Sequence, residues 1–295
     1  MSSIVAGTSR TKSTSAEARV LAAATPRQGL VLSYVVLVLL SLAVIFPLLF
    51  ALSIAIQGDT VSPKLFPDFA KTDWSVFAQT FAKEGNLGRW ILNSFVVSCA
   101  VTLGQIVTSA LAAYPLAMFR FKGQSLFFFF FIGTLMIPWE ATIIPNYLTI
   151  AKLGWKDSYP GLIVPFVASG FGVFLLRQSF KAIPRELFEA ATMEGCGRLD
   201  FLVRILLPLS KPAIATLAIY TFIGTWNQYY WPLLIIDNPI WRTTQVGITA
   251  FRSSEIASFN LQMAATIIVM LPTLVLLTLG MRQLVSGLTA GAVKG

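Results

Sequence analysis

Six long apolar stretches follow one another along the chain, and charged side chains gather in the segments between them. A helix crosses a bilayer core with about 20 apolar residues. Strands of a membrane barrel alternate apolar and polar residues over about 10 positions, and these stretches do not alternate. The pattern therefore predicts an all-α integral membrane protein with six transmembrane helices. The stretches cover residues 28–58, 90–119, 123–151, 158–176, 212–236 and 256–281.

Composition excludes several other classes of protein. Apolar types make up 56% of the 295 residues and charged types only 12%, against a usual charged share of about 25%. The chain has no His, which excludes His-based catalysis and His metal ligation. Cys99 and Cys196 lie too far apart in sequence for a metal-ligand pattern. No glycine-rich phosphate loop is present, so we expect a non-catalytic chain without a cofactor of its own.

The net charge of +9 indicates orientation in a membrane. The N-terminal tail, 119–125, 177–211 and the C-terminal tail together carry a net charge of +9, and the segments that alternate with them carry none. Because basic loops stay on the cytoplasmic side, we expect a multi-pass protein of the bacterial cytoplasmic membrane with both termini in the cytoplasm. The charge is thereby accounted for, and we expect no nucleic-acid partner.

The order of apolar and polar segments predicts the domain organisation. In the segment after the first helix, Trp74, Phe77 and Phe81 recur at helical spacing, which favours a short amphipathic helix on the outer surface. We expect 1–28 to be a disordered cytoplasmic tail, 29–56 the first transmembrane helix, 57–88 an external loop, 89–282 the membrane core and 283–295 a cytoplasmic C-terminal tail.

The loop 177–211 predicts a short helix of about ten residues beneath the membrane. Pro184 suits a helix start, and Gly195 and Gly197 suit a left-handed helix end. Leu187, Phe188 and Ala191 would form an apolar face. Such a helix either docks another protein or rests on lipid headgroups, and the residues alone leave both interpretations open.

The same loop carries a known motif. Glu189, Ala190, Ala191, Gly195, Ile205, Leu207 and Pro208 stand at the spacing of the EAA loop. The chain thereby resembles the permeases of ABC importers, and further segments resemble the carbohydrate-uptake branch, the group of MalG-like and UgpE-like subunits. Those segments are 92–94, 112–123, 171–178, 226–233 and 287–295.

The resemblance implies the fold of a type I ABC importer permease and a set of partners. A second related permease would complete the pathway as a heterodimer, two ATPase subunits would bind ATP and Mg on the cytoplasmic side, and an extracytoplasmic solute-binding protein would deliver the solute. Glu189 would be a polar contact to the ATPase, Ala190 and Ala191 a close-packing surface, and Gly195 the turn. Leu207 and Pro208 complete the coupling motif.

Candidate residues for the solute pathway lie in two apolar stretches. Glu140 is the only acid within such a stretch and stands between Pro138 and Pro145, which predict a bent or broken helix. Because an ionised group there is costly, Glu140 either lines the pathway or pairs with another chain. In a continuous helix over 212–236, one turn would hold the other candidates, which either contact solute or pack between helices. They are Trp226, Asn227, Gln228, Tyr229 and Tyr230, with Asn227 and Tyr230 on one face and Trp226 and Tyr229 on another.

The solute and two other classes stay open from the sequence. The segments around 138–150 and 226–235 are similar to those of permeases for sn-glycerol 3-phosphate and related diesters, with sugars and polyols as alternatives. A self-contained secondary carrier or channel would favour internal repeats and coupling-ion sites, and we find neither. A membrane-embedded lipid-modifying enzyme would favour His or several acids near the interface, and the cytoplasmic acids here lie within the EAA loop.

Overall fold

Helices make up all the regular structure in the residues described by the computed structural model, which are 27–57, 72–82, 86–253 and 259–289. This confirms the all-α prediction. The helices are α2 (Arg27–Ile56), α3 (Val76–Ala82), α4 (Leu87–Met118), α5 (Gln124–Thr134), α6 (Trp139–Lys152), α7 (Tyr159–Ile163), η2 (Val164–Phe166), α8 (Gly170–Lys181), α9 (Arg185–Met193), α10 (Arg198–Phe201), η3 (Leu202–Leu206), α11 (Leu207–Leu209), α12 (Lys211–Trp226), α13 (Tyr230–Ile235), η4 (Pro239–Trp241), α14 (Thr244–Ser253) and α15 (Phe259–Thr289).

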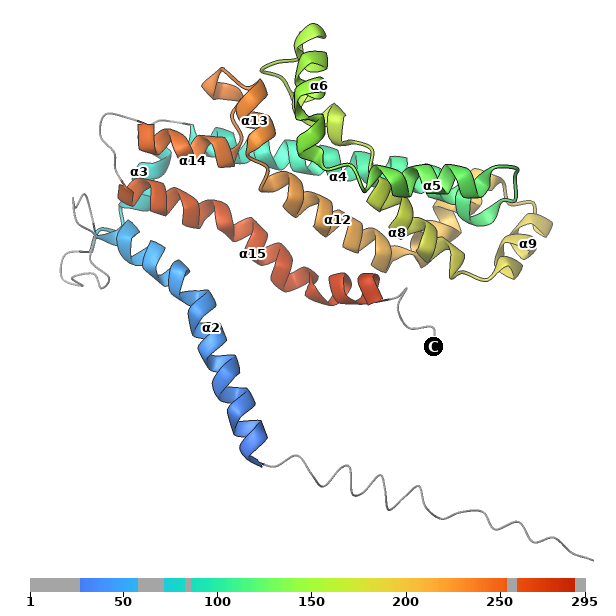
Figure 1. Cartoon of the computed structure of the whole chain (residues 1–295), viewed down its shortest axis with the longest axis horizontal. Coiled ribbons are helices and arrows are strands. Elements are labelled where there is room, and N and C mark those ends of the chain that lie inside the picture. The colour runs from blue at the N-terminus through green and yellow to red at the C-terminus, as the bar shows by residue number, and fades with distance from the viewer. Residues whose placement is uncertain (1–26, 58–71, 83–85, 254–258, 290–295) are drawn as a thin grey trace, which may run out of the picture. The chain divides into compact units, whose positions relative to one another are not determined.

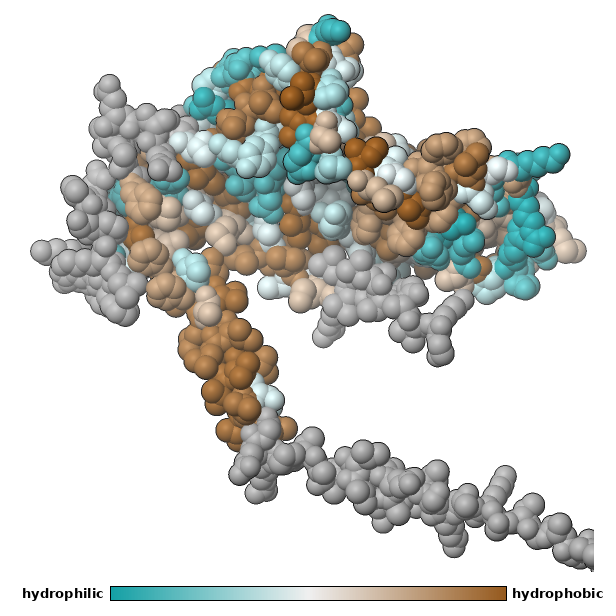
Figure 2. All heavy atoms as spheres, in the orientation of Figure 1, coloured by the Kyte–Doolittle hydropathy of each residue, from teal (hydrophilic) through white to brown (hydrophobic). Residues whose placement is uncertain are grey.

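The chain divides into two compact units, residues 1–51 and 52–295. The described part of the first unit belongs to α2, a continuous apolar helix that is long enough to cross a membrane from Leu30 to Ile56. Hydrophobic side chains cover it in Figure 2. The candidate span Leu30–Ile56 lies within the apolar stretch 28–58, and all but the last two residues of the expected tail 1–28 lie outside the described part.

The second unit is a bundle built around α4. Helices α8 and α12 pack against α4, and α15 packs against α12 (Figure 1). Ser94, Ser98, Ser109 and Ala113 are buried on α4, so its backbone lies close to its neighbours. A side chain at Gly172 of α8 would overlap the Ser109 hydroxyl. These small residues allow α4 to lie inside the bundle.

Three helices are long and apolar enough to cross a membrane unbroken, within the described part of the chain: Leu30–Ile56, Leu87–Met118 and Phe259–Met281. Three helix pairs pass the same test but are bent, α5 with α6 by 91°, α7 and η2 with α8 by 48°, and the segment Arg198–Leu209 with α12 by 80°. Six crossings result only if each bent pair is one span. The expected break at Pro138 is confirmed, since Pro138 directly precedes α6.

Three expectations about helix boundaries are wrong. The stretch 212–236 is not one helix, because α12 ends at Trp226 and α13 begins at Tyr230. The stretch 158–176 is likewise divided before α8, where the Ser169 hydroxyl caps the new helix by accepting a bond from Gly172 N–H at 3.2 Å. Helix α15 continues to Thr289 instead of ending near Met281. Apolarity locates membrane-embedded residues but does not report the direction of the backbone.

The predicted external segment contains the predicted short helix. Helix α3 buries Val76 and Thr80 and packs against α15 and α4, while Trp74 stays 59% exposed beside the ring of Phe77. Residues 58–71 and 83–85 lie outside the described part. In Figure 1 this helix lies at the end of the second unit opposite α9, together with α14.

Candidate functional site

Helix α9 carries the EAA motif and has defined ends. Pro184 directly precedes it, and Gly195, with a φ of 83°, follows it in the left-handed region. The N–H of Cys196 donates to the Ala191 carbonyl at 2.9 Å, which is the long hydrogen bond of a Schellman cap. The sequence therefore correctly predicted both the helix and the glycine that ends it.

One face of α9 anchors the helix to its own chain. Ala191 is buried in the core between α4, α8 and the segment that follows α9, and Phe188 packs against that core. The Phe188 ring meets Phe119 and Phe201 edge to face, with centroids 5.8 and 4.9 Å apart. Leu187, in contrast, is exposed. Of the apolar face expected from Leu187, Phe188 and Ala191, only Phe188 and Ala191 pack together on the core, and the inclusion of Leu187 is wrong.

The opposite face of α9 is open. Glu189 and Ala190 are exposed, as is Gly195 at the turn, and the side chain of Met193 is 90% exposed. Hydrophilic side chains gather over this end of the second unit in Figure 2. Of the two motif alanines, only Ala190 faces outward, because the helix turns Ala191 toward the core.

Leu207 and Pro208 of the motif shape the backbone after α9. Gly197, which was expected to end α9, has a φ of −68° and precedes α10 instead. The N–H of Leu207 donates to the Leu202 carbonyl, five residues back, so that η3 is a π-helical turn. Proline has no N–H to donate, and the helical direction changes by 80° at Ser210. These motif residues thus lie at the bend that joins α9 to α12.

The five candidates around Asn227 lie at a break between helices. Trp226 is 1% exposed and its indole N–H donates to the Val269 carbonyl of α15 at 3.0 Å, so it anchors the end of α12. Asn227 is exposed and accepts a hydrogen bond from the Gln245 side chain of α14 at 3.2 Å. Tyr230, which is 69% exposed, begins α13. Since α12 ends here, the predicted sharing of helix faces among these residues is wrong.

Gln228 and Tyr229 complete this break. Both are half-buried in the turn between α12 and α13, and the Tyr229 ring contacts that of Tyr230 with centroids 5.5 Å apart. Four of the five candidates thus reach the surface to some degree, and Trp226 does not.

Two helix breaks come together through a pair of tryptophans. Trp139 at the start of α6 and Trp231 at the start of α13 pack edge to face, with ring centroids 5.7 Å apart. Their sequence neighbours Glu140 and Tyr230 are both exposed. Because these two rings are in contact, the break before α6 and the break after α12 lie side by side. Breaks of this kind in membrane helices leave backbone groups that are satisfied only by protein or water.

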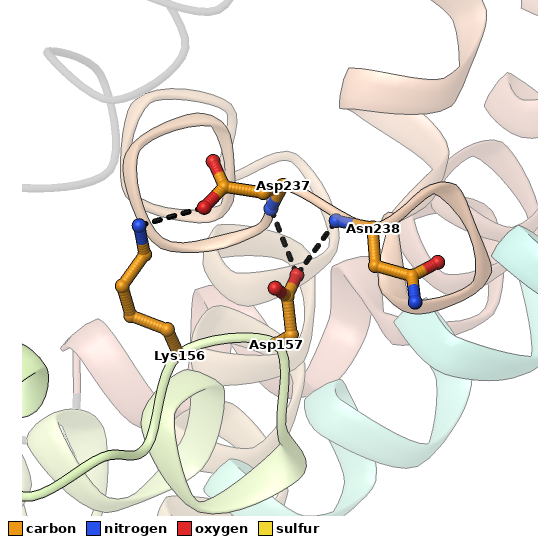
Figure 3. A network of polar contacts seen from close by, with 4 residues as sticks. All are labelled: Lys156, Asp157, Asp237 and Asn238. Atoms are coloured by element: carbon orange, nitrogen blue, oxygen red, sulfur yellow. Dashed lines mark hydrogen bonds and ion pairs between the residues drawn. The ribbon is translucent and has the colours of Figure 1, made fainter.

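A polar network that sequence reasoning missed joins the far ends of the same two helices (Figure 3). Asp157, with a φ of 51°, accepts hydrogen bonds from the backbone N–H groups of Asp237 and Asn238, each at 2.8 Å. Lys156 pairs with the Asp237 carboxylate at 2.7 Å, and this hydrogen bond raises the pKa of Lys156. Lys156 therefore stays protonated at neutral pH. The Asp-Ser-Tyr-Pro turn was the available signal. We call Lys156, Asp157, Asp237 and Asn238 the Asp157 network.

The described residues contain no group of three His, Cys, Asp or Glu side chains that could hold a metal ion. Among the described side chains, ion pairs join Lys156 to Asp237 and Arg204 to Asp200.

Comparison with known proteins identifies the family. Residues 105–289 match the family model described as "Binding-protein-dependent transport system inner membrane component". The sn-glycerol-3-phosphate transport system permease protein UgpE of Yersinia enterocolitica is 39% identical over 274 residues, which are 89% of this chain and 97% of that protein. UgpE of Pectobacterium atrosepticum is 43% identical over 203 residues, which are 68% of this chain and 72% of that protein.

Solved structures share the fold. A bacterial ABC transporter involved in the import of the acidic polysaccharide alginate aligns with a TM-score of 0.76 and 21% identity, over 87% of this chain and 96% of that one. The alginate transporter in complex with an alginate pentasaccharide-bound periplasmic protein aligns with a TM-score of 0.63 and 16% identity, over 88% and 96% of the two chains. The chain belongs to the binding-protein-dependent transport family of inner membrane components, as a membrane permease subunit of an ABC importer.

Proposed function

We propose that α9 is the surface on which a partner ATPase docks, and that its movement drives alternating access through the membrane. The observation that carries this proposal is the division of the helix into two faces. Phe188 and Ala191 fix it to the core, while Glu189 and Ala190 are exposed at one end of the second unit. Because one face of α9 is packed on the core and the other is exposed, a displacement of α9 by a bound partner would move the bundle with it.

The chemistry of the open face suits a protein partner. Ala190 has a small side chain that permits close backbone approach, and Glu189 offers a carboxylate for a charge-assisted hydrogen bond. Two ATPase subunits bind and hydrolyse ATP, and this chain contributes no catalytic group and no cofactor. Glu189 is the polar contact, and Gly195, Leu207 and Pro208 set the shape of the loop that carries it.

Reversal of one charge tests the docking role. Glu189→Lys replaces an acceptor with a donor, so we expect the permease to reach the membrane but to retain the ATPase poorly. Co-purification on a tagged ATPase subunit, followed by ATP-driven uptake in proteoliposomes, measures both effects. Glu194→Lys is the matched control, because it makes the same charge change at an exposed position where the motif specifies no residue type. Normal co-purification and uptake for Glu189→Lys would contradict the docking role.

The complete importer contains further subunits in this proposal. This chain crosses the bacterial cytoplasmic membrane six times, with each bent helix pair as one span and both termini in the cytoplasm. A second, related permease forms the other half of the pathway, and an extracytoplasmic solute-binding protein delivers the solute. The unequal distribution of basic residues among the loops supports this orientation.

The paired helix breaks are the proposed contact with the solute. Discontinuous helices form the binding sites of many transporters, because their ends expose unpaired backbone groups. Asn227, Gln228 and Tyr230 offer amide and hydroxyl groups at one break, and Glu140 stands at the other. Trp226 and Tyr229 support this site from the side of the protein.

The solute is sn-glycerol 3-phosphate or a related glycerophosphodiester in this proposal, with sugars and polyols as the alternatives. Two relatives that are about two-fifths identical carry this solute in their names. The cognate binding protein provides the test. We expect sn-glycerol 3-phosphate to raise its thermal unfolding midpoint and to compete for uptake. A shift with an oligosaccharide or a polyol alone would overturn this assignment and leave the docking role untouched.

A further inference from the structure

The C-terminal end of α4 is held by arginines from other segments. The last four carbonyl groups of a helix have no partner within it. Two of those at the end of α4 accept hydrogen bonds from guanidinium groups, Leu116 from Arg177 of α8 and Met118 from Arg185 of α9. Cationic groups at this position also match the negative end of the helix dipole.

Arg177 is buried without an acid. Its side chain is 9% exposed, its Nε–H donates to the Leu116 carbonyl at 3.0 Å, and its guanidinium lies 3.6 Å from the ring centroid of Phe128 on α5. No carboxylate lies within ion-pair distance of it among the described side chains. Burial of a charged side chain costs free energy unless other polar groups replace its hydration. The helix end and the aromatic face together replace its hydration, and they join α8 to α4 and α5.

Arg185 makes the corresponding connection from α9. It is the first residue of the helix, and its Nη2–H donates to the Met118 carbonyl at 2.8 Å. Three residues later, Phe188 packs on Phe119, the residue that follows α4. The docking helix is thus joined to the end of α4 by one charge-assisted hydrogen bond and one aromatic contact.

We propose that Arg177 and Arg185, here called the arginine clasp, are positioning residues that transmit the movement of α9 to α4, α5 and α8. The inference rests on the proposed docking of the ATPase on α9 and concerns what happens after docking. With the clasp intact, a displaced α9 takes the end of α4 with it. Without the clasp, the ATPase still docks and hydrolyses ATP, but the bundle follows less of its motion.

The two arginines differ in what can replace them. Arg185 uses one donor toward one carbonyl, which an ammonium group can supply. Arg177 uses its Nε–H and also places its plane over a ring, which Lys cannot reproduce.

The experiment uses the complete importer in proteoliposomes and measures solute transported per ATP hydrolysed. We expect Arg185→Ala to lower this ratio about tenfold, a size typical of coupling between sites, with normal ATPase co-purification. Arg185→Lys should restore the ratio, whereas Arg177→Lys should lower it. Arg120→Ala, which removes an exposed charge from the loop between α4 and α5, is the matched control and should match wild type.

Each other outcome counts against the proposal. An unchanged ratio in Arg185→Ala, or an equal loss in Arg120→Ala, overturns it. Loss of ATPase co-purification in Arg185→Ala also overturns it, because the arginine would then support docking instead of transmission. If Arg177→Lys fails to reach the membrane, the Arg185 series alone decides. The docking proposal is tested separately, because normal ATPase co-purification and uptake in Glu189→Lys would contradict it without any measurement on the arginines.

Discussion

Substitution of Gly195 tests whether a left-handed turn keeps α9 in the shape that the ATPase meets. The residue has a φ of 83°, and no atom lies within 4 Å of the position where a Cβ would stand. Alanine therefore meets no clash within the chain, and the cost is the backbone conformation alone. That cost is roughly 1–2 kcal/mol for an L residue, which lowers the population of the native turn by a factor of about 5–30.

The hydrogen bonds at stake are those of the Schellman cap. The N–H of Gly195 donates to the Thr192 carbonyl at 3.1 Å, and that of Cys196 to the Ala191 carbonyl at 2.9 Å. Asparagine tolerates left-handed backbone better than alanine does. If conformation is what matters, Gly195→Asn should retain ATPase binding and uptake better than Gly195→Ala.

Three measurements on the same preparations distinguish the possibilities. Immunoblots of membranes give the permease level, co-purification on a tagged ATPase gives docking, and proteoliposomes give ATP-driven uptake. We expect Gly195→Ala to leave the permease level unchanged and to reduce docking and uptake several-fold. Wild-type docking and uptake in Gly195→Ala would refute the reasoning. A loss in Gly195→Asn as large as that in Gly195→Ala would also refute it, because added bulk and not φ would then be responsible.

Three further predictions follow from other parts of the structure. If Asn227 contacts the solute, Asn227→Ala should impair uptake about tenfold, which corresponds to about 1.4 kcal/mol, with normal assembly and basal ATP hydrolysis; wild-type uptake would remove this residue from the pathway. Asp157→Ala removes the acceptor of two backbone N–H groups and should speed amide exchange in the turn 236–239 by about tenfold, whereas Asp157→Asn should not; equal exchange in both variants would contradict this. With both native cysteines replaced, a cysteine at Trp74 should react with an impermeant maleimide from outside and one at Ala190 should not; labelling of the latter from outside would overturn the orientation.

The sequence predicted the elements whose residues carry explicit local signals. Pro138 lies where α6 begins, and Gly195 adopts the left-handed backbone that only glycine adopts readily. The EAA spacing located α9 within one or two residues. These signals act over a few bonds, so they do not depend on the packing of the rest of the chain.

Other features depend on tertiary contacts that a single sequence does not display. The apolar stretch 212–236 holds one local signal for its break, Pro232 in the first turn of α13. The sequence does not show the tertiary contact beside the break, in which the indole of Trp226 at the end of α12 donates to the Val269 carbonyl of a helix far along the chain. Which face of α9 is buried likewise depends on tertiary contacts. Phe188 packs on Phe119 and Phe201, and this orientation turns Ala191 toward the core. The motif names both alanines but not which of them is exposed.

The Asp157 network holds α6 and α13 together as one rigid unit. The two helices contact each other at their starts through Trp139 and Trp231, and the turns that follow them are joined by the Asp157 carboxylate and by the ion pair between Lys156 and Asp237. Spin labels on exposed positions of α6 and α13 should therefore keep a constant separation throughout the transport cycle. The α6–α13 unit would then serve as a fixed reference, and distances from it to labels on the other helices would report how far each of them moves.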